Sequence, residues 1–161
     1  MKRLGSFMVF VAAVALTLGS CMKTEDFGAV EQNNIDDFIS KHPDIPFTQK
    51  ASGLYYFEVA PGEGDVAKTH DTVYVFYTGK FLDGSVFDTN VGKQTLGFAV
   101  GEAFVIPGFD EAVSYMRQGG KSTFIIPSKL GYGPMGYYTI PGYTPLLYEV
   151  TMVKLAKGPA R

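Results

Sequence analysis

The chain has 161 residues, a formal net charge of −2 at pH 7 and no tryptophan. This acidic composition contains no basic run, which argues against nucleic acid as a partner. Because Cys21 is the only cysteine, an intramolecular disulfide is excluded, and an apolar core must supply the stability.

The first 20 residues predict a secretory signal peptide. A basic start at Lys2 and Arg3 precedes an apolar run, residues 7–18, that is too short to span a membrane as a helix. Small residues end this run directly before Cys21, and this arrangement resembles the lipobox of bacterial lipoproteins. The resemblance implies cleavage before Cys21, acylation of that residue and stable lipid anchoring in a bacterial membrane. An ordinary signal peptide that leaves a free thiol is the alternative.

Residues 21–50 are predicted to form a tether with one short helix. The polar stretch after the cysteine is expected to be extended. An asparagine pair ending at Asn34 predicts the helix cap, because Ile35, Phe38 and Ile39 follow at the i, i+3, i+4 spacing of an apolar face. The helix is too short to be stable alone. It therefore either packs on the next domain or frays, and its apolar stripe favours packing.

Residues 51–157 are predicted to form one domain of short strands. The chain's 19 glycines and 9 prolines indicate frequent turns, and Asp83-Gly84 is a hairpin signal. Residues 62–65 are expected to form a loop. Strands rich in aromatic and β-branched residues are expected over residues 54–59, 72–81, 86–87, 96–100, 123–126 and 146–152.

One helix is expected inside this domain, over residues 108–118. Phe109, Val113 and Met116 repeat at the i, i+4, i+7 spacing of a buried helix face. The glycine pair that begins at Gly119 is expected to end the helix. Mostly antiparallel strands with one helix packed on one face define an α+β domain.

Several short motifs follow one another in a characteristic order. They are Phe-Tyr-Thr-Gly at 76–79, Asp-Gly at 83–84 with Val-Phe-Asp at 86–88, Val-Ile-Pro-Gly-Phe at 105–109, Gly-Gly-Lys at 119–121, Ile-Pro-Ser at 126–128, Gly-Tyr-Gly at 131–133, and Ile-Pro at 140–141 before Leu-Tyr-Glu-Val at 147–150. With this order and spacing, residues 53–155 resemble an FKBP-type peptidyl-prolyl isomerase domain. The resemblance implies a curved antiparallel sheet wrapped around one short helix.

The activity that the resemblance implies is cis–trans isomerisation of the bond before proline. The barrier, roughly 18–20 kcal/mol, is the loss of amide resonance, and the twisted bond has less charge separation than the planar one. A dry, aromatic hollow therefore favours the twisted state. This chemistry needs no nucleophile, metal or cofactor, and none is expected.

The resemblance also implies a set of pocket residues. Phe109 would form the pocket floor. The backbone N–H of Ile106 and the hydroxyl of Tyr132 would donate to substrate carbonyls. Asp88 would be the one charged group at the rim, hydrogen-bonded to Tyr77 or to the substrate, so Tyr77, Asp88 and Tyr132 are the predicted catalytic residues. The other predicted substrate-binding residues are Phe87, Phe98, Val105, Ile106, Ile140 and Tyr148.

Simpler interpretations of these residues remain open. Phe109 could belong only to the helix core, and Tyr77 and Tyr148 could be ordinary core tyrosines with bonded hydroxyls. Asp88 could serve only in a turn. The family more often has tryptophan at the position of Phe109, which puts the strength of macrolide binding in doubt.

Two functions are weighed for the whole protein. The first is an isomerase that is lipid-anchored at the bacterial cell envelope, faces the periplasm or the surface, and assists the folding of exported proteins. The alternative is a low-turnover peptide-binding module or holdase that uses the same apolar pocket. For both functions, the expected partners are proline-containing polypeptides that are unfolded or partly folded. A macrolide inhibitor is a further expected ligand. A surface lipoprotein that binds a small ligand in this hollow is a third interpretation.

Overall fold

The computed structural model describes residues 26–159. The predicted signal peptide, residues 1–20, and the predicted lipidation site, Cys21, lie outside these residues. The helices are α1 (Phe27–Lys41) and α2 (Pro107–Ser114), with a 3-10 turn, η1 (Ser128–Leu130). The strands are β1 (Thr48–Gln49), β2 (Tyr55–Ala60), β3 (Glu63–Val66), β4 (Thr72–Lys80), β5 (Val86–Thr89), β6 (Leu96–Ala99), β7 (Arg117–Gln118), β8 (Lys121–Ile126) and β9 (Leu146–Ala156).

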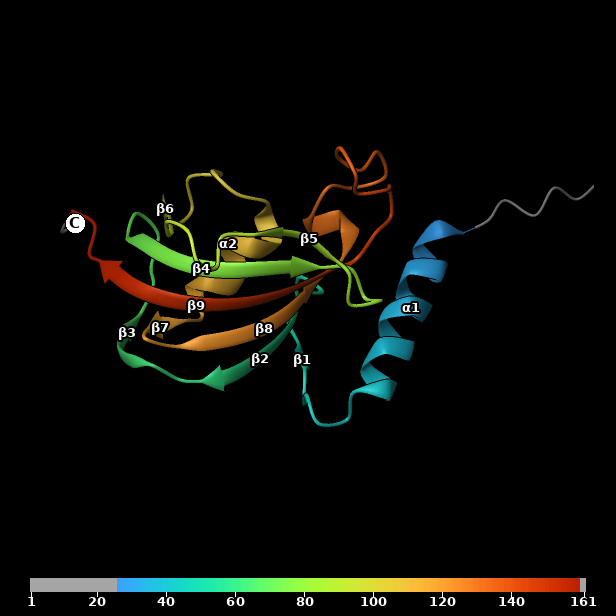
Figure 1. Ribbon diagram of the computed structural model, residues 1–161, viewed down its shortest axis with the longest axis horizontal. Coiled ribbons are helices and arrows are strands. Elements are labelled where there is room, and N and C mark those ends of the chain that lie inside the picture. The colour runs from blue at the N-terminus through green and yellow to red at the C-terminus, as the bar shows by residue number, and fades with distance from the viewer. Residues whose placement is uncertain (1–25, 160–161) are drawn as a thin grey trace, which may run out of the picture.

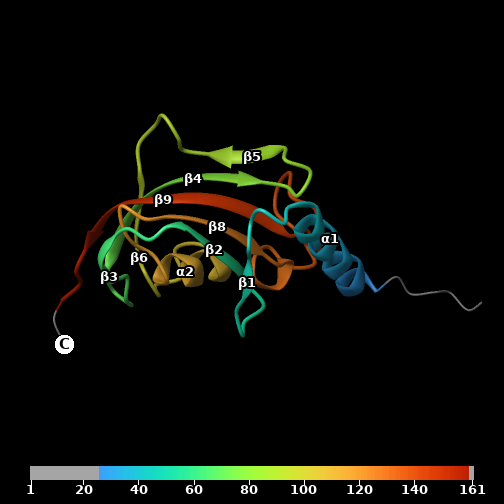
Figure 2. The ribbon, with the colours of Figure 1, turned by 90° about the horizontal axis from the view of Figure 1, so that it is seen from below.

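A curved antiparallel sheet wraps around α2, which confirms the predicted α+β fold (Figures 1 and 2). The strand order of this 7-stranded sheet is β1-β2-β8-β9-β4-β5, and β6 pairs with β4 beside β5. The pairing of β4 with β9 is the most extensive in the sheet, running from Thr72 opposite Ala156 to Lys80 opposite Leu147. A separate pair, β3 with β7, forms a small second sheet.

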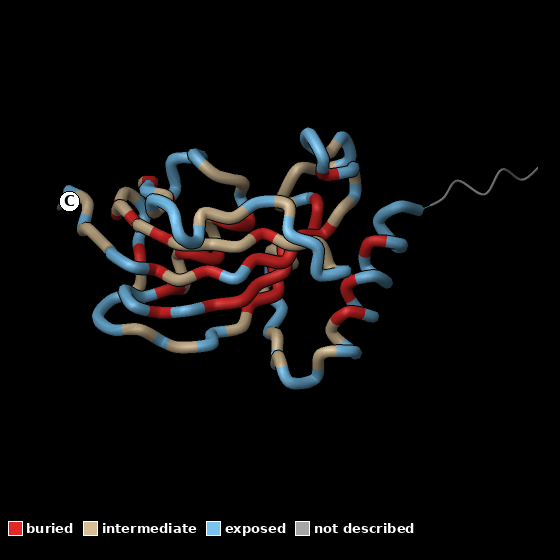
Figure 3. The backbone as a smooth tube through the Cα atoms, viewed as in Figure 1, coloured by how far each residue is buried: buried red, intermediate tan, exposed pale blue. Residues whose placement is uncertain are grey.

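The main core lies between the concave face of the sheet and α2. Alternate residues of β9 point into it, because successive side chains of a strand face opposite sides. From β9 these are Leu146, Tyr148, Val150 and Met152, as the alternation predicts. Figure 3 shows buried residues concentrated along the strands and recurring at intervals along α1.

Helix α1 begins earlier than predicted. Its N-cap is Asp26, whose side chain accepts a hydrogen bond from the N–H of Ala29 at 3.2 Å. Asn33 and Asn34, predicted to be the cap, are exposed residues within the helix. Asp and Asn are comparable as caps, and the apolar spacing after Asn34 did not reveal the preceding turns because those turns are largely exposed.

The predicted packing of α1 on the domain is confirmed. Ile35 and Phe38 form a second apolar cluster with Tyr55, Ile125 and Leu147, one residue from each of β2, β8 and β9. The sheet neighbours of these strand residues face α2, so α1 packs on the opposite side of the sheet from α2. Among the described helices, none is long and apolar enough to cross a membrane.

Helix α2 is shorter than predicted, and the predicted loop at 62–65 is wrong. The helix ends at Ser114, and Arg117 instead lies in β7, where it pairs with Val66 of β3. The Arg117 side chain also donates to the carbonyl of Gly64 at 2.5 Å. The helical spacing extended to Met116 because this side chain packs into the same core from the turn after the helix.

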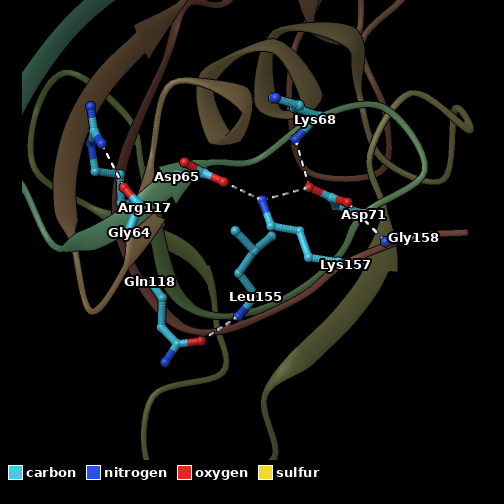
Figure 4. A network of polar contacts seen from close by, with 9 residues as sticks. All are labelled: Gly64, Asp65, Lys68, Asp71, Arg117, Gln118, Leu155, Lys157 and Gly158. Carbon is cyan, nitrogen blue, oxygen red and sulfur yellow. Dashed lines mark hydrogen bonds and ion pairs between the residues drawn. The ribbon is translucent and has the colours of Figure 1, made fainter. Parts of the chain in front are cut away.

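A polar network secures the C-terminal end of β9 to the turn before β4 (Figure 4). The buried Asp71 carboxylate accepts hydrogen bonds from the N–H groups of Gly158 at 2.8 Å and Lys68 at 3.0 Å. Lys157 lies between Asp65 at 3.4 Å and Asp71 at 3.7 Å. The hydrogen bond from Gly158 and the other donors lower the pKa of the Asp71 carboxyl, although burial acts in the opposite direction.

We expect Asp71→Asn to lower the unfolding temperature at pH 7. A carboxyl whose pKa is lower in the folded state stabilises the fold at every pH above its pKa in the unfolded chain, which is about 4. This stabilisation is lost as the pH falls toward and through the pKa of the folded state. The difference between the two proteins should therefore shrink in acid. Thermal unfolding followed by circular dichroism from pH 7 to pH 3 measures this, and a difference that is constant over the whole range would contradict it.

Candidate active site

A pocket of about 440 Å³ opens at the edge of the main core, where β4, β5, β6 and β9 approach the start of α2. The segment after η1 borders it, and residues 134–145 of that segment are called the flap. The lining residues are Tyr77, Asp88, Leu96, Phe104, Val105, Ile106, Phe109, Tyr132, Tyr137 and Tyr148. Asp88 is the one charged residue in this set, so the pocket surface is mainly aromatic and aliphatic.

Phe109 is both a core residue and a pocket residue. Pro107 occupies the first turn of α2, which suits a helix start, and places Phe109 over the sheet. The Phe109 ring is 3% exposed and makes edge-to-face contacts with Tyr77 at 5.8 Å and Tyr148 at 5.1 Å between ring centroids. Core and pocket therefore share this side chain, and its predicted role as the floor remains a proposal.

Three of the predicted substrate-binding residues, Phe87, Phe98 and Ile140, are not among the lining residues and pack beside them. Phe87 packs edge-on against Tyr148 at 5.7 Å, Phe98 is 4% exposed beside Phe109, and Ile140 is buried in the same core. The pocket surface instead includes side chains absent from the predicted set: Leu96, Phe104 and Tyr137. Family spacing identified the region, but only the three-dimensional packing separates side chains that line a pocket from those that support it.

The glycine of the Phe-Tyr-Thr-Gly motif has a steric role. A Cβ atom at Gly79 would lie 2.5 Å from Cζ of Phe87 and 3.0 Å from Cε1 of Tyr148. The absence of a side chain at Gly79 therefore lets both rings approach β4. This close packing fixes Tyr148, which does line the pocket.

Tyr77 and Asp88 form the hydrogen-bonded pair that the sequence predicted as one option. The Tyr77 hydroxyl donates to Oδ2 of Asp88 at 2.6 Å. Burial raises the pKa of the Tyr77 hydroxyl, and the hydrogen bond to Asp88 raises it further, so the phenol keeps its proton. Asn90, which sequence reasoning missed, fixes the backbone here: its Oδ1 accepts from the Tyr77 N–H at 2.7 Å and its Nδ2 donates to the Val75 carbonyl at 3.0 Å.

Two potential donors at the pocket have no acceptor within residues 26–159. They are the backbone N–H of Ile106, at the N-cap of α2, and the hydroxyl of Tyr132. The carbonyl of Ile106 is already used, since it accepts from the N–H groups of Phe109 and Asp110. Burial, and then the nearby Asp88 carboxylate, raise the pKa of the Tyr132 hydroxyl. The phenol therefore remains a neutral donor at physiological pH.

A larger hollow, about 650 Å³, lies between α1, the turn after β4 and the flap. Charged or ionisable side chains contribute to its lining, among them Asp37, Lys41 and Asp83. Asp37 and Lys41 already form an ion pair at 2.7 Å. Phe38, Phe81 and Tyr143 also line this hollow, but the smaller pocket is lined mainly by aromatic side chains and by one charged residue, and it is therefore the candidate active site.

Comparison with known proteins gives a consistent result. The family model for FKBP-type peptidyl-prolyl cis-trans isomerase matches residues 64–153. A probable FKBP-type peptidyl-prolyl cis-trans isomerase from Haemophilus influenzae is 36% identical over 143 residues, which cover 86% of this chain and 58% of that protein. The crystal structure of FkpA from Escherichia coli aligns with a TM-score of 0.72 at 30% identity, over 83% of this chain and 62% of that one.

A peptidyl-prolyl cis-trans isomerase from Pseudomonas syringae pv. tomato aligns over its whole length, 100%, and over 86% of this chain, with a TM-score of 0.69 at 28% identity. The chain therefore belongs to the FKBP-type peptidyl-prolyl cis-trans isomerase family, and the resemblance seen in its motifs is confirmed. It spans only part of the curated relatives, 58% of the Haemophilus protein and 40% of Escherichia coli FkpA.

Proposed function

We propose that this domain isomerises X–Pro bonds in unfolded or partly folded polypeptides. The observation that carries the proposal is the combination found in one pocket: aromatic walls, a rim carboxylate at Asp88, and donors at Ile106 and Tyr132 that have no acceptor within residues 26–159. Family membership supports the same reaction. The pocket volume, about 440 Å³, is within the usual range for small-molecule sites and can take a proline ring with a neighbouring side chain.

In the proposed mechanism, the apolar surroundings of the bound peptide bond lower the barrier, and no covalent intermediate forms. The planar amide carries the larger charge separation, so transfer from water to an aromatic pocket costs it more than the twisted form. Phe109 and Tyr148 contact the proline ring in this scheme. The Ile106 N–H and the Tyr132 hydroxyl bind substrate carbonyls and hold the backbone on either side while the bond turns. Such donors contribute only when they are already oriented toward the twisted geometry.

Asp88 is proposed to act at the rim through its contact with Tyr77. The carboxylate is exposed, while the Tyr77 ring contacts Phe109. The hydrogen bond between them fixes the Tyr77 ring as one wall and places a negative charge near the carbonyl carbon of the twisting amide. A simple turn role for Asp88 would not need the 2.6 Å contact with Tyr77.

We expect the chain from Met22 onward to accelerate cis–trans exchange in proline tetrapeptides. The rate should be highest with an apolar residue before proline, because Phe104 is 68% exposed at the pocket rim and offers an apolar surface there. A protease-coupled assay over a set of peptides measures this. Rates equal to the uncatalysed background for every peptide would contradict the proposal and favour the peptide-binding module.

The same assay tests whether the hydroxyl of Tyr132 contributes to turnover. Tyr132→Phe removes one hydroxyl and should lower kcat roughly two- to tenfold, the value of one neutral hydrogen bond. Tyr138→Phe makes the identical change on a flap residue that is 91% exposed and absent from the lining, and should leave kcat unchanged. Equal effects of the two substitutions would remove Tyr132 from the mechanism.

Macrolide binding by this pocket is a further part of the proposal, and Phe109→Trp tests it. The added ring should extend into the pocket, because Tyr77, Phe124 and Tyr148 enclose the other sides of Phe109. A rigid ligand gains contacts there, so affinity should rise more than turnover. The chain has no other tryptophan, so fluorescence titration reports binding directly.

Inhibition of the isomerase supplies the affinity of the unsubstituted protein. Phe104→Trp is the matched control, because it places the same fluorophore at the exposed rim. Unchanged or weaker macrolide affinity in Phe109→Trp would show that neighbouring residues already compensate for the smaller floor.

We also propose that Cys21 anchors the protein by acyl chains at the bacterial cell envelope, where exported proteins would be its substrates. The sequence pattern of residues 1–21 supports this. Cys21 lies shortly before Asp26, the residue that caps α1. In this proposal, the anchor would hold the domain close to the membrane surface.

Substitution of the anchor residue tests the location. Cys21→Ser should release the full-length protein from the membrane fraction, while Met22→Ser should not, because only the cysteine thiol can be acylated. Sedimentation followed by immunodetection measures the distribution, and the isomerase assay should give equal kcat for both. A Cys21→Ser protein that still sediments with membranes would place the anchor in the apolar run of residues 7–18.

A further inference from the structure

Glu31 is a buried carboxylate on α1 that the proposed chemistry does not use. It is 9% exposed, and both of its oxygens are bonded to one residue. Oε1 accepts from the N–H of Ser128 at 2.5 Å, and Oε2 accepts from its Oγ–H at 2.7 Å. A buried carboxylate is retained in a fold only with such partners. This contact joins residues separated by 97 positions, so it links the N-terminal helix to η1.

Ser128 in turn holds both neighbours of Tyr132. Its carbonyl oxygen accepts from the N–H of Gly131 at 2.9 Å and from the N–H of Gly133 at 2.8 Å. The backbone on either side of Tyr132 is therefore attached to the residue that Glu31 holds. The Tyr132 hydroxyl has no protein acceptor within residues 26–159, so its placement depends on this backbone and on ring stacking with Tyr137 at 5.3 Å.

Helix α1 reaches the same backbone by a second route. Phe27, in its first turn, stacks on Tyr143 of the flap with ring centroids 5.1 Å apart. The Tyr143 N–H donates to the carbonyl of Gly133 at 3.0 Å. Figures 1 and 2 both show α1 beside this part of the chain. Ile35 and Phe38 fix the helix to the sheet, so the attachment has a rigid base.

We propose that Glu31 is a positioning residue for catalysis, which holds the Tyr132 hydroxyl in place through Ser128. The inference rests on the proposed role of Tyr132 as a substrate donor. A donor contributes to a transition state only if it is oriented before the reaction begins, and a loop orients it less well than a helix or strand. Glu31 transfers the rigidity of α1 to that loop.

Kinetics of Glu31 variants test the proposal in the chain from Met22 onward, which contains every described element. Glu31→Ala should lower kcat roughly two- to tenfold, like Tyr132→Phe, with little change in KM, because the apolar lining is intact. Glu31→Gln should restore most of kcat, since the amide oxygen can accept from the Ser128 N–H and the amide nitrogen can donate to its Oγ. An unchanged kcat in Glu31→Ala would overturn the proposal.

Two control variants separate positioning from general loss of stability. Asp71→Asn changes the polar network at the C-terminal end of β9, away from α1, and should lower the unfolding temperature without lowering kcat. Asp36→Ala removes an exposed carboxylate from the same helix and should leave kcat unchanged. A kcat that follows the unfolding temperature across all three substitutions would show that Glu31 is only structural.

A double-mutant cycle decides whether Glu31 acts through Tyr132. In a Tyr132→Phe background, Glu31→Ala should cause little further loss of kcat, because the group it positions is already absent. Hydrogen exchange at the Gly131 and Gly133 amides should be faster in Glu31→Ala, where the support of Ser128 is lost. If the fold-losses of kcat in the two single variants multiply in the double variant, the proposal is overturned. Hydrogen exchange at Gly131 and Gly133 that is unchanged in Glu31→Ala would also overturn it.

The outcomes also distinguish this inference from the proposed function. If Tyr132→Phe lowers kcat and Glu31→Ala does not, only the positioning role fails. If Tyr132→Phe retains full kcat, the donor role of Tyr132 fails as well, and if the unsubstituted chain has no turnover, the isomerase function fails. Should Glu31→Ala not fold, Ser128→Ala removes only the Oγ–H donor and enters the same cycle, with a smaller expected loss.

Discussion

The structure depends on the packing of one ring, Phe109, between the concave face of the sheet and the pocket. Its contacts with Tyr77, Phe124 and Tyr148 connect the start of α2 to β4, β8 and β9. Because the ring is 3% exposed and also borders the pocket, the side chain that holds the helix on the sheet also lines part of the cavity. The pocket is an opening at the edge of the core, so its apolar surface is continuous with the core.

The positions of the carboxylates follow from the same constraint. Asp88 lies at the rim, where water solvates it, and accepts one hydrogen bond from the Tyr77 hydroxyl. Glu31 is buried far along the chain from the pocket residues and has both oxygens bonded to Ser128. An unpaired carboxylate inside the aromatic pocket would be costly. The fold therefore keeps charge at the edge of the site, and a buried charge occurs only where donors already exist.

Sequence patterns predicted the fold and most of its strands well, because the alternation of buried and exposed residues, as in β9, reflects packing directly. These predictions failed where the sequence offers two neighbouring residues for the same structural role. Met116 continues a helical spacing although the helix has ended, since a core accepts side chains from turns as well as from helices. Asp26 and Asn34 are both good caps, and only tertiary contacts select between them. Phe98 and Phe104 are neighbours in one stack, and sequence alone could not tell which one borders the cavity.

Helix α1 gives the molecule a connection that neither the motifs nor the sheet requires. One face holds the convex side of the sheet through Ile35, another holds η1 through Glu31, and its first turn meets the flap at Tyr143. The helix lies before residues 64–153, which match the family model. Glu31 and Phe27 both contact residues that are hydrogen-bonded to the backbone beside Tyr132, so a displacement of α1 would disturb these contacts. A flexible linker in the place of α1 would provide no such coupling.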